Sequence, residues 1–274
     1  MRSTASATTT SCASTRTSSS SWCSRASSSA CRPPTSSTRA SSTHPASSEP
    51  PHRPQVPMGP RVKLSIVPSE LAATRLAVHE HARAKLPTTS GAFDIVSFVD
   101  AAGTLLDDIA LVRGDLQGDA PVPVRVHSEC VTGDVLGSLR CDCGEQLRQA
   151  LAQIDAAGRG VLLYLRQEGR GIGIANKVAA YALQDAGLDT VDANLHLGFD
   201  DDLRSYATAG AMLRTLGLGC IELITNNPRK LDGLRAAGLE VVRRVPIVMP
   251  PRAENREYLR TKQARSGHLL GGDD

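Results

Sequence analysis

Three cysteines in one short stretch have the residue type and spacing of a metal site. Ten residues separate Cys130 from Cys141, and one residue separates Cys141 from Cys143. Thiolate is a good zinc ligand, and a Cys-x-Cys turn lets two sulfurs reach the same ion. The neighbouring sequence has no fourth cysteine and no suitably spaced histidine. The pattern therefore predicts three protein ligands and an open position for water, which is the arrangement of a catalytic zinc.

The alternative is that these cysteines are small buried hydrophobic residues. That interpretation suits Cys220, which lies in the apolar run 220–224. It suits Cys141 and Cys143 poorly, because they flank an aspartate in a polar turn. Spacing and polarity together favour a metal site for this pair.

A glycine-rich turn over residues 166–174 is the second stretch that predicts chemistry. Backbone N–H groups at a helix start can hold a phosphate, and Arg166 and Arg170 would add positive charge. The turn is not a dinucleotide fingerprint, because Ile174 and Asn176 stand where that motif needs small residues. It is not a P-loop either, because no Gly-Lys-Ser/Thr follows. A plain flexible loop is the alternative, but the charged residues favour a ligand role.

Two further loops carry reactive or polar side chains. Three aspartates at 200–202 precede a helix expected over 203–216, and helix capping explains one aspartate better than three. Thr-Asn-Asn-Pro-Arg-Lys at 225–230 follows an expected strand, at the strand end where α/β sheets bind ligands. Its hydroxyl, amides and cations predict a polar, anionic ligand. His127 and His196 have no spaced partner, so the pattern alone marks them as ordinary histidines.

Strands alternate with helices along most of the chain after residue 90. Apolar runs and period-two alternation predict strands at 92–99, 109–112, 122–126, 161–165, 220–225 and 240–245. Helical periodicity predicts helices at 144–157, 174–186, 203–216 and 229–237. In the first of these helices, Leu147, Ala150, Leu151 and Ile154 form the apolar stripe. This alternation indicates an α/β domain.

Composition limits the class of protein. The chain has 274 residues, 41% of them hydrophobic, which suffices for one sizeable globular domain with an appendage. A net charge of +3 is too small to argue for nucleic acid or membrane as a partner, and aromatic residues at 3% give little base stacking. No stretch is apolar enough to span a membrane. Cysteines in metal spacing favour a reducing cytoplasm over a disulfide framework.

The composition changes sharply near Met58. Residues 1–57 are rich in Ser, Thr and Arg, and such a low-complexity segment cannot bury enough apolar surface to order itself. It could be a disordered extension, an organelle transit peptide, or the product of a start codon placed before the true one at Met58. We therefore expect a disordered extension at 1–57 and a catalytic domain at 58–274.

These stretches together resemble GTP cyclohydrolase II over roughly residues 83–270. The resemblance rests on several motifs in the family's order, which is more specific than any single motif. They are Lys85-Leu86-Pro87-Thr88, the cysteine segment, Arg166-Gln167-Glu168-Gly169-Arg170, Tyr181-Ala182-Leu183-Gln184-Asp185, Leu197-Gly198-Phe199, Thr225-Asn226-Asn227-Pro228 and Gly267-His268-Leu269-Leu270. Many such enzymes carry a fused dihydroxybutanone phosphate synthase. Residues 1–57 are too short and too polar for one, so a monofunctional form is expected.

The resemblance implies a fold, a reaction and partners. The fold would be a single catalytic α/β (α+β) domain with a mixed sheet and flanking helices. The reaction would be the first step of riboflavin biosynthesis, in which the imidazole ring of GTP is opened at C8. Formate and pyrophosphate leave, and 2,5-diamino-6-(5-phospho-ribosylamino)pyrimidin-4(3H)-one remains. A homodimer in the cytoplasm and a magnesium ion on the triphosphate are also implied.

The resemblance also implies residue roles. Cys130, Cys141 and Cys143 would hold one zinc per chain. The GTP contacts would be Arg125, Val126, His127, Ser128, Glu129, Gln146, Glu168, Gly169, Arg170, Thr190, Thr225 and Lys230. Tyr181 would serve ring opening, Asp202 would be a base, and Arg204 would be a nucleophile toward the α-phosphorus. A guanidinium is protonated at ordinary pH, so a charge clamp is the alternative role for Arg204. Ser205 replaces an aspartate that the family pattern usually has.

Three alternatives compete with this prediction. A zinc nucleobase deaminase would use His127-Ser128-Glu129 as its His-x-Glu motif, but the Pro-Cys-x-x-Cys half is absent. A non-catalytic module stabilised by zinc would require a fourth protein ligand. A variant inside the family would open the ring yet retain the formyl group, and Tyr181 argues against it.

Overall fold

Residues 76–270, the part of the chain described by this computed structural model, contain one sheet of seven strands. The strands are β1 Val78–Thr88, β2 Gly91–Asp100, β3 Leu105–Arg113, β4 Val122–Ser128, β5 Gly160–Leu165, β6 Cys220–Ile224 and β7 Glu240–Val245. Their spatial order is β1-β2-β3-β5-β4-β6-β7. The disordered extension predicted at 1–57, and the predicted domain start at Met58, lie outside the described residues.

The sheet has an antiparallel half and a parallel half. Strands β1, β2, β3 and β5 pair antiparallel, whereas β5, β4, β6 and β7 pair parallel. Parallel strands end at the same edge of a sheet, so the segments that follow β4, β5 and β6 are brought together. These segments contain the cysteines, the glycine-rich turn and the loop 225–230.

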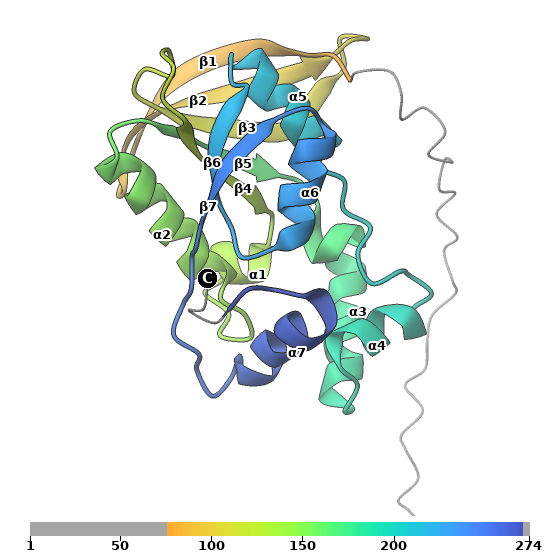
Figure 1. Cartoon of the computed structure of the whole chain (residues 1–274). Coiled ribbons are helices and arrows are strands. Elements are labelled where there is room, and N and C mark those ends of the chain that lie inside the picture. Colours follow the sequence, from red (N-terminus) through yellow and green to blue (C-terminus); the bar gives the residue numbers. More distant parts are fainter. Residues whose placement is uncertain (1–75, 271–274) are drawn as a thin grey trace, which may run out of the picture. The chain divides into compact units, whose positions relative to one another are not determined.

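Helices flank this sheet, which confirms the predicted mixed α/β architecture. They are α1 Val131–Asp134, α2 Cys143–Ala156, α3 Gly173–Asp185, α4 Thr190–His196, α5 Ala207–Thr215, α6 Pro228–Ala236 and α7 Arg256–Ser266, with a 3₁₀ turn at Glu168–Gly171. Figure 1 shows α1, α3, α4 and α7 gathered at one end of the sheet, away from β1 and β2.

Two hydrophobic clusters hold helices against the two faces of the sheet. On one face, Ala150 and Ile154 of α2 pack with Leu162, which confirms the predicted apolar stripe. On the other face, Met212 of α5 packs in the cluster that contains Leu163. The side chains of neighbouring β5 residues thus point to opposite faces of the sheet, and both are buried because helices cover both faces.

The helix predicted over 203–216 begins only at Ala207, so its predicted start was wrong. The aspartates do not cap it: Tyr206 occupies the N-cap position and makes no side-chain cap. Asp202 instead accepts hydrogen bonds from Arg204, and Asp201 accepts one from Arg229. These charge pairs hold the segment before Ala207 as a loop.

Several elements carry little sequence signal and were not predicted. Strand β1 exposes most of its side chains and has no regular apolar alternation, so pairing with β2 defines it. Helices α4 and α7 are short or mostly polar, and α1 is a single turn. None of the helices within residues 76–270 is long and apolar enough to cross a bilayer.

Candidate active site

A pocket opens where the parallel strands end. Most of the predicted site residues line it: Arg125, His127, Ser128, Glu129, Cys130, Cys141, Cys143, Gln146, Glu168, Gly169, Arg170, Tyr181, Thr190, Arg204, Thr225 and Lys230. Two predicted residues do not. Val126 is fully buried in the hydrophobic core, and Asp202 reaches the pocket only through its contact with Arg204.

The three predicted cysteines converge at one end of this pocket. Their sulfurs all lie within 4.8 Å of one another, and Cys130 Sγ is 3.7 Å from Cys141 Sγ. Two sulfurs bound to a tetrahedral zinc at about 2.3 Å lie roughly 3.8 Å apart. Hydrogen bonds from Cys141 and Cys143 hold the pKa of the Cys130 thiol well below its usual range. The donor set and its spacing therefore fit a metal ion.

Gly133 of α1 leaves the space that this cluster occupies. A Cβ added at Gly133 would lie 2.8 Å from Cys141 Sγ and 3.2 Å from Cys130 Sγ. Real Cβ atoms essentially never approach another atom as closely as the first of these distances. The short helix α1 thus depends on glycine to let the sulfurs close around one point.

We expect Gly133→Ala to weaken zinc binding on the order of tenfold to a hundredfold, because the added methyl displaces ligand sulfurs. A competition titration against a chromophoric chelator measures this change. Gly219→Ala is the matched control, because no heavy atom lies within 4 Å of its added Cβ. Equal zinc affinity in Gly133→Ala and wild type would show that the sulfurs do not act as a group.

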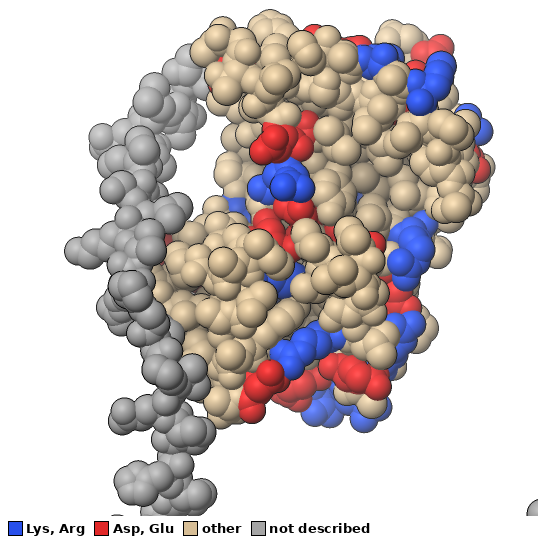
Figure 2. All heavy atoms as spheres, turned by 180° about the vertical axis from the view of Figure 1, so that it is seen from behind, with Lys and Arg blue, Asp and Glu red and all other residues tan. Residues whose placement is uncertain are grey.

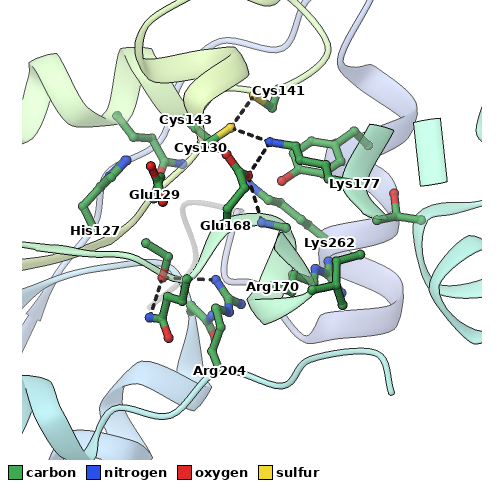
Figure 3. Close-up of a pocket in the computed structure, with 18 of the residues that line it drawn as sticks. His127, Glu129, Cys130, Cys141, Cys143, Glu168, Arg170, Lys177, Arg204 and Lys262 are labelled. Atoms are coloured by element: carbon green, nitrogen blue, oxygen red, sulfur yellow. Dashed lines mark hydrogen bonds and ion pairs between the residues drawn. The ribbon is translucent and has the colours of Figure 1, made fainter. Parts of the chain in front are cut away.

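Lys177 on α3 places a largely buried positive charge against the cysteines. Its Nζ donates to Cys130 Sγ at 3.1 Å, to Thr132 Oγ1 at 3.0 Å and to Glu168 Oε1 at 2.7 Å (Figure 3). Burial alone would lower the pKa of Lys177, but Glu168 and Cys130 raise it, so the ammonium stays charged. Sequence reasoning missed Lys177. The available signal was its position four residues before Tyr181, on the same face of the helix.

A chain of buried polar side chains holds the Cys-x-Cys turn. Asp142, between two of the cysteines, accepts from Lys262 Nζ at 2.9 Å and from Gln146 Nε2 at 2.6 Å. Gln146 in turn accepts from Arg125 Nη2 at 2.7 Å. Burial alone would raise the pKa of Asp142, but Lys262 lowers it. One charged and one neutral side chain thus hold the turn, and Lys262 was not predicted.

His127 is oriented by a neighbouring carboxylate and is not part of the sulfur cluster. Its Nε2 lies 3.0 Å from Asp134 Oδ2, and that carboxylate also accepts from Tyr164 Oη and from the Cys130 N–H, each at 2.9 Å. Burial lowers the pKa of His127, which favours the neutral ring. Among the described residues, the one group that could hold a metal ion consists of the three cysteines. A deaminase would need His127 as a ligand, so this geometry weighs against that alternative.

Arg204 lies at the other end of the pocket from the cysteines, as Figure 3 shows. Asp202 Oδ1 accepts from Arg204 Nε at 2.8 Å, and Asp202 Oδ2 accepts from Nη2 at 2.7 Å. The remaining nitrogen, Nη1, lies 3.5 Å from Ser128 Oγ. Ser205 is exposed and its hydroxyl accepts from the Ala207 N–H, so this substitution leaves the Asp202–Arg204 pair intact.

The glycine-rich turn packs against the loop that carries Arg204. The Arg170 carbonyl accepts from the Leu203 N–H at 3.0 Å, and a Cβ on Gly171 would lie 3.1 Å from Leu203 Cβ. Glycine therefore permits this close approach. Arg166, predicted to hold a phosphate, does not line the pocket and instead donates to Glu129 at 2.8 Å.

The amides of the 225–230 loop are used by the protein itself. Asn226 exchanges two hydrogen bonds with the backbone of Ile247, and Asn227 caps α6. Both asparagines line the pocket, but these hydrogen bonds also give them a structural role. Lys230 remains in the pocket, with its Nζ 2.7 Å from the Val126 carbonyl. Burial, together with repulsion from Arg125 and other cations, lowers the pKa of Lys230, so a bound anion would relieve this repulsion.

The face of the molecule in Figure 2 carries acidic and basic side chains interspersed with one another. No single-sign field extends across that view. Inside the pocket, by contrast, Arg170, Arg204, Lys230 and Lys262 gather around one space. These cations give the pocket a positive charge that would attract a small anion.

The fold and the pocket together define an α/β protein that brings a candidate metal centre and several cations to one ligand site. The family model described as GTP cyclohydrolase II matches residues 79–246, and the chain belongs to this family of enzymes.

Curated relatives agree with this assignment. The chain is 56% identical over 185 residues to the riboflavin biosynthesis protein RibBA of Bacillus cytotoxicus, covering 68% of this chain and 46% of that one. It is 55% identical over 193 residues to RibBA of a Bacillus cereus strain, covering 70% and 48%. The chain thus spans about half the length of the curated relatives it matches. A solved structure titled RibBX, a two domain 3,4-dihydroxy-2-butanone 4-phosphate synthase from A. baumannii, matches with a TM-score of 0.34 and 19% identity, covering 62% of this chain and 41% of that one.

Proposed function

We propose that this protein hydrolyses GTP with the help of zinc, opening the imidazole ring and releasing formate and pyrophosphate. The product would be 2,5-diamino-6-(5-phospho-ribosylamino)pyrimidin-4(3H)-one, made for riboflavin biosynthesis. One observation carries the proposal: a cluster of three cysteines and the cation Arg204 lie at opposite ends of one pocket. A nucleotide has its base at one end and its phosphates at the other, so it could place its base near the cysteines and its phosphates near Arg204.

Cys130, Cys141 and Cys143 would hold the zinc, placing the base end of the nucleotide beside them. A zinc ion bound in this way would lower the pKa of its bound water to near neutrality. The resulting hydroxide would be a nucleophile suited to attack on C8. Tyr181 lies beside the cluster, with its hydroxyl 3.3 Å from Thr132 Oγ1. Burial raises the pKa of Tyr181, so its phenol stays protonated and can give a hydrogen bond or a proton during ring opening.

The other proposed GTP contacts divide into cations and polar groups. Arg125, Arg170 and Lys230 would meet the negative charge of the substrate, while the remaining contacts would orient it. The carboxylate of Glu168 already accepts from the Val131 and Gly169 N–H groups and from Lys177. We therefore assign Glu168 mainly to holding the glycine-rich turn in shape.

Arg204 would stabilise the departing pyrophosphate as a charge clamp. Burial alone would lower the pKa of Arg204, but the bidentate contact with Asp202 raises it. A guanidinium held in this protonated state is a poor nucleophile. Its orientation by a buried carboxylate is what a preorganised electrostatic group needs. Asp202 would then position Arg204, in place of the base role that the family resemblance implied.

The proposal extends to a second metal ion, the domain boundary, the oligomeric state and the compartment. A magnesium ion would accompany the triphosphate and share in neutralising its charge. The catalytic domain would begin near residue 58 and work as a homodimer. The free cysteines at 130, 141, 143 and 220 suit a reducing compartment such as the cytoplasm.

Product analysis after incubation of the purified protein with GTP tests this proposal. We expect equimolar formate and pyrophosphate together with the diaminopyrimidinone. Ammonia in place of formate would support a deaminase, and a ring-opened product that keeps its formyl group would support the alternative inside the family. Unchanged GTP with zinc bound would contradict the proposed activity and favour a binding module.

A further inference from the structure

The C-terminal segment 256–270 lies beyond the family-model match at 79–246, yet it forms one wall of the pocket. Tyr258 and Lys262 from α7, and His268 just after it, are pocket-lining residues. Only the motif that contains His268 was noted in the sequence, and no role was predicted for any of the three.

Three contacts tie this segment to separate parts of the site. Lys262 donates to Asp142 in the cysteine turn at 2.9 Å, and both side chains are buried. Arg265 donates to Asp189, the residue before Thr190, at 2.8 Å. The Leu269 N–H donates to the Asn226 carbonyl at 2.9 Å. The segment therefore spans the metal end, the α4 wall and the 225–230 loop.

The side chain of His268 is half-buried in the pocket wall, and one of its ring nitrogens has no partner among residues 76–270. Its Nδ1 atom is buried and makes no hydrogen bond among the described residues. A buried polar atom without a partner costs stability, so its presence in a pocket indicates a missing ligand. Burial and the nearby cations Lys262, Arg170, Arg204 and Lys230 lower the pKa of His268 to about 3. The ring is thus neutral near pH 7 and can donate one N–H.

The surroundings of His268 identify the chemistry of this ligand. The charges that act most strongly on the ring are all positive, and they come from four separate segments of the pocket. Lys262 and Arg204 are paired with aspartates, whereas Arg170 and Lys230 donate to backbone carbonyls, which carry no net charge. An anion with several oxygens would balance the charge of Arg170 and Lys230. A phosphate chain supplies such oxygens, and its oxygens accept hydrogen bonds from a neutral imidazole.

We propose that the segment 256–270 closes the nucleotide pocket and that His268 donates a hydrogen bond to the triphosphate of the substrate. Lys262 anchors the segment to the cysteine turn through its contact with Asp142. This assignment rests on the proposed function, because it places one part of the GTP molecule. His268 is a substrate-binding residue here and takes no part in proton transfer.

Calorimetric binding of inorganic tripolyphosphate to the zinc-loaded full chain tests the proposal directly. We expect His268→Ala to weaken this binding roughly tenfold to a hundredfold, as loss of a hydrogen bond to a charged group does. The melting temperature should stay near the wild-type value, because the buried Nδ1 of His268 makes no hydrogen bond within the described part of the chain. His196→Ala on α4 is the control, because His196 is exposed and does not line the pocket.

Two further measurements separate binding from structure. Guanosine lacks phosphates, so it should bind wild type and His268→Ala equally. With GTP, the variant should show a raised KM and a kcat close to wild type. His268→Gln, whose amide retains a donor, should recover part of the tripolyphosphate affinity.

The proposal fails if His268→Ala binds tripolyphosphate as tightly as wild type does. It also fails if the substitution lowers the affinities for guanosine and for tripolyphosphate by the same factor. A variant that melts earlier yet keeps its affinity also overturns it, because His268 would then be structural. Failure of the proposed function looks different: wild type itself would leave GTP unchanged, whatever residue stands at position 268.

Discussion

Cys141→Ser should lose its zinc and its formate release together. A serine hydroxyl stays protonated near neutral pH and is a poor zinc ligand, so only two thiolates would remain at the site. Elemental analysis of the purified variant should give well under one zinc per chain. Assay of the same sample with GTP should give no formate above background.

The control for this variant is Cys220→Ser. Cys220 is a free, partly buried cysteine on β6, and it is not part of the three-cysteine group. Its replacement should leave zinc content and activity close to wild type. A Cys141→Ser protein with full zinc and undiminished formate release would contradict the assignment of the metal site.

Arg204→Ala should suppress pyrophosphate and formate release together if the phosphoryl step comes first. Loss of one preorganised charge stabiliser typically lowers kcat by about 10²- to 10³-fold. Arg204→Lys should keep measurable activity, because an ammonium can replace part of the charge that a clamp supplies. Rapid-quench measurement of both products in the two variants provides the comparison.

Arg229→Ala is the matched control for the arginine experiment. Arg229 also pairs with Asp202, at 3.4 Å, but its side chain is 45% exposed. We expect only a small loss of activity there, since an exposed ion pair contributes little. A trapped protein–GMP adduct in wild type that is absent from Arg204→Lys would overturn the clamp and support a nucleophilic Arg204.

The parts of the site that depend on local sequence were predictable. Cysteine spacing predicted the three-cysteine cluster, because Cys141 and Cys143 share a single turn and Cys130 comes shortly after the strand predicted at 122–126. Placement of the 225–230 loop followed from the rule that ligands bind at the carboxyl ends of parallel strands. Apolar periodicity predicted most of the strands and helices that carry these segments.

The contacts that complete the site were not predictable, because they join segments far apart in the chain. Lys177 and Cys130 are separated by 47 positions, and Lys262 and Asp142 by 120. Nothing in a polar stretch such as 256–266 indicates that it covers a pocket. Likewise, the sequence could not show that Asn226 bonds to Ile247.

The prediction of where α5 begins was wrong for a related reason. Asp202 pairs with Arg204 and Arg229, so charge pairing competes with helix capping for the same side chain. Capping rules consider only the nearest backbone N–H groups. The competing partner Arg229 comes from a helix that begins 26 positions further on, at Pro228.

A zinc titration of the metal-free protein tests the central claim most directly. The protein is stripped with a chelator, checked for retained fold by circular dichroism, and incubated with GTP at rising zinc. Formate release should be absent without metal, rise in proportion to added zinc, and level off at one zinc per chain. Full formate release from the metal-free protein, or a plateau that requires several zinc ions per chain, would contradict the account.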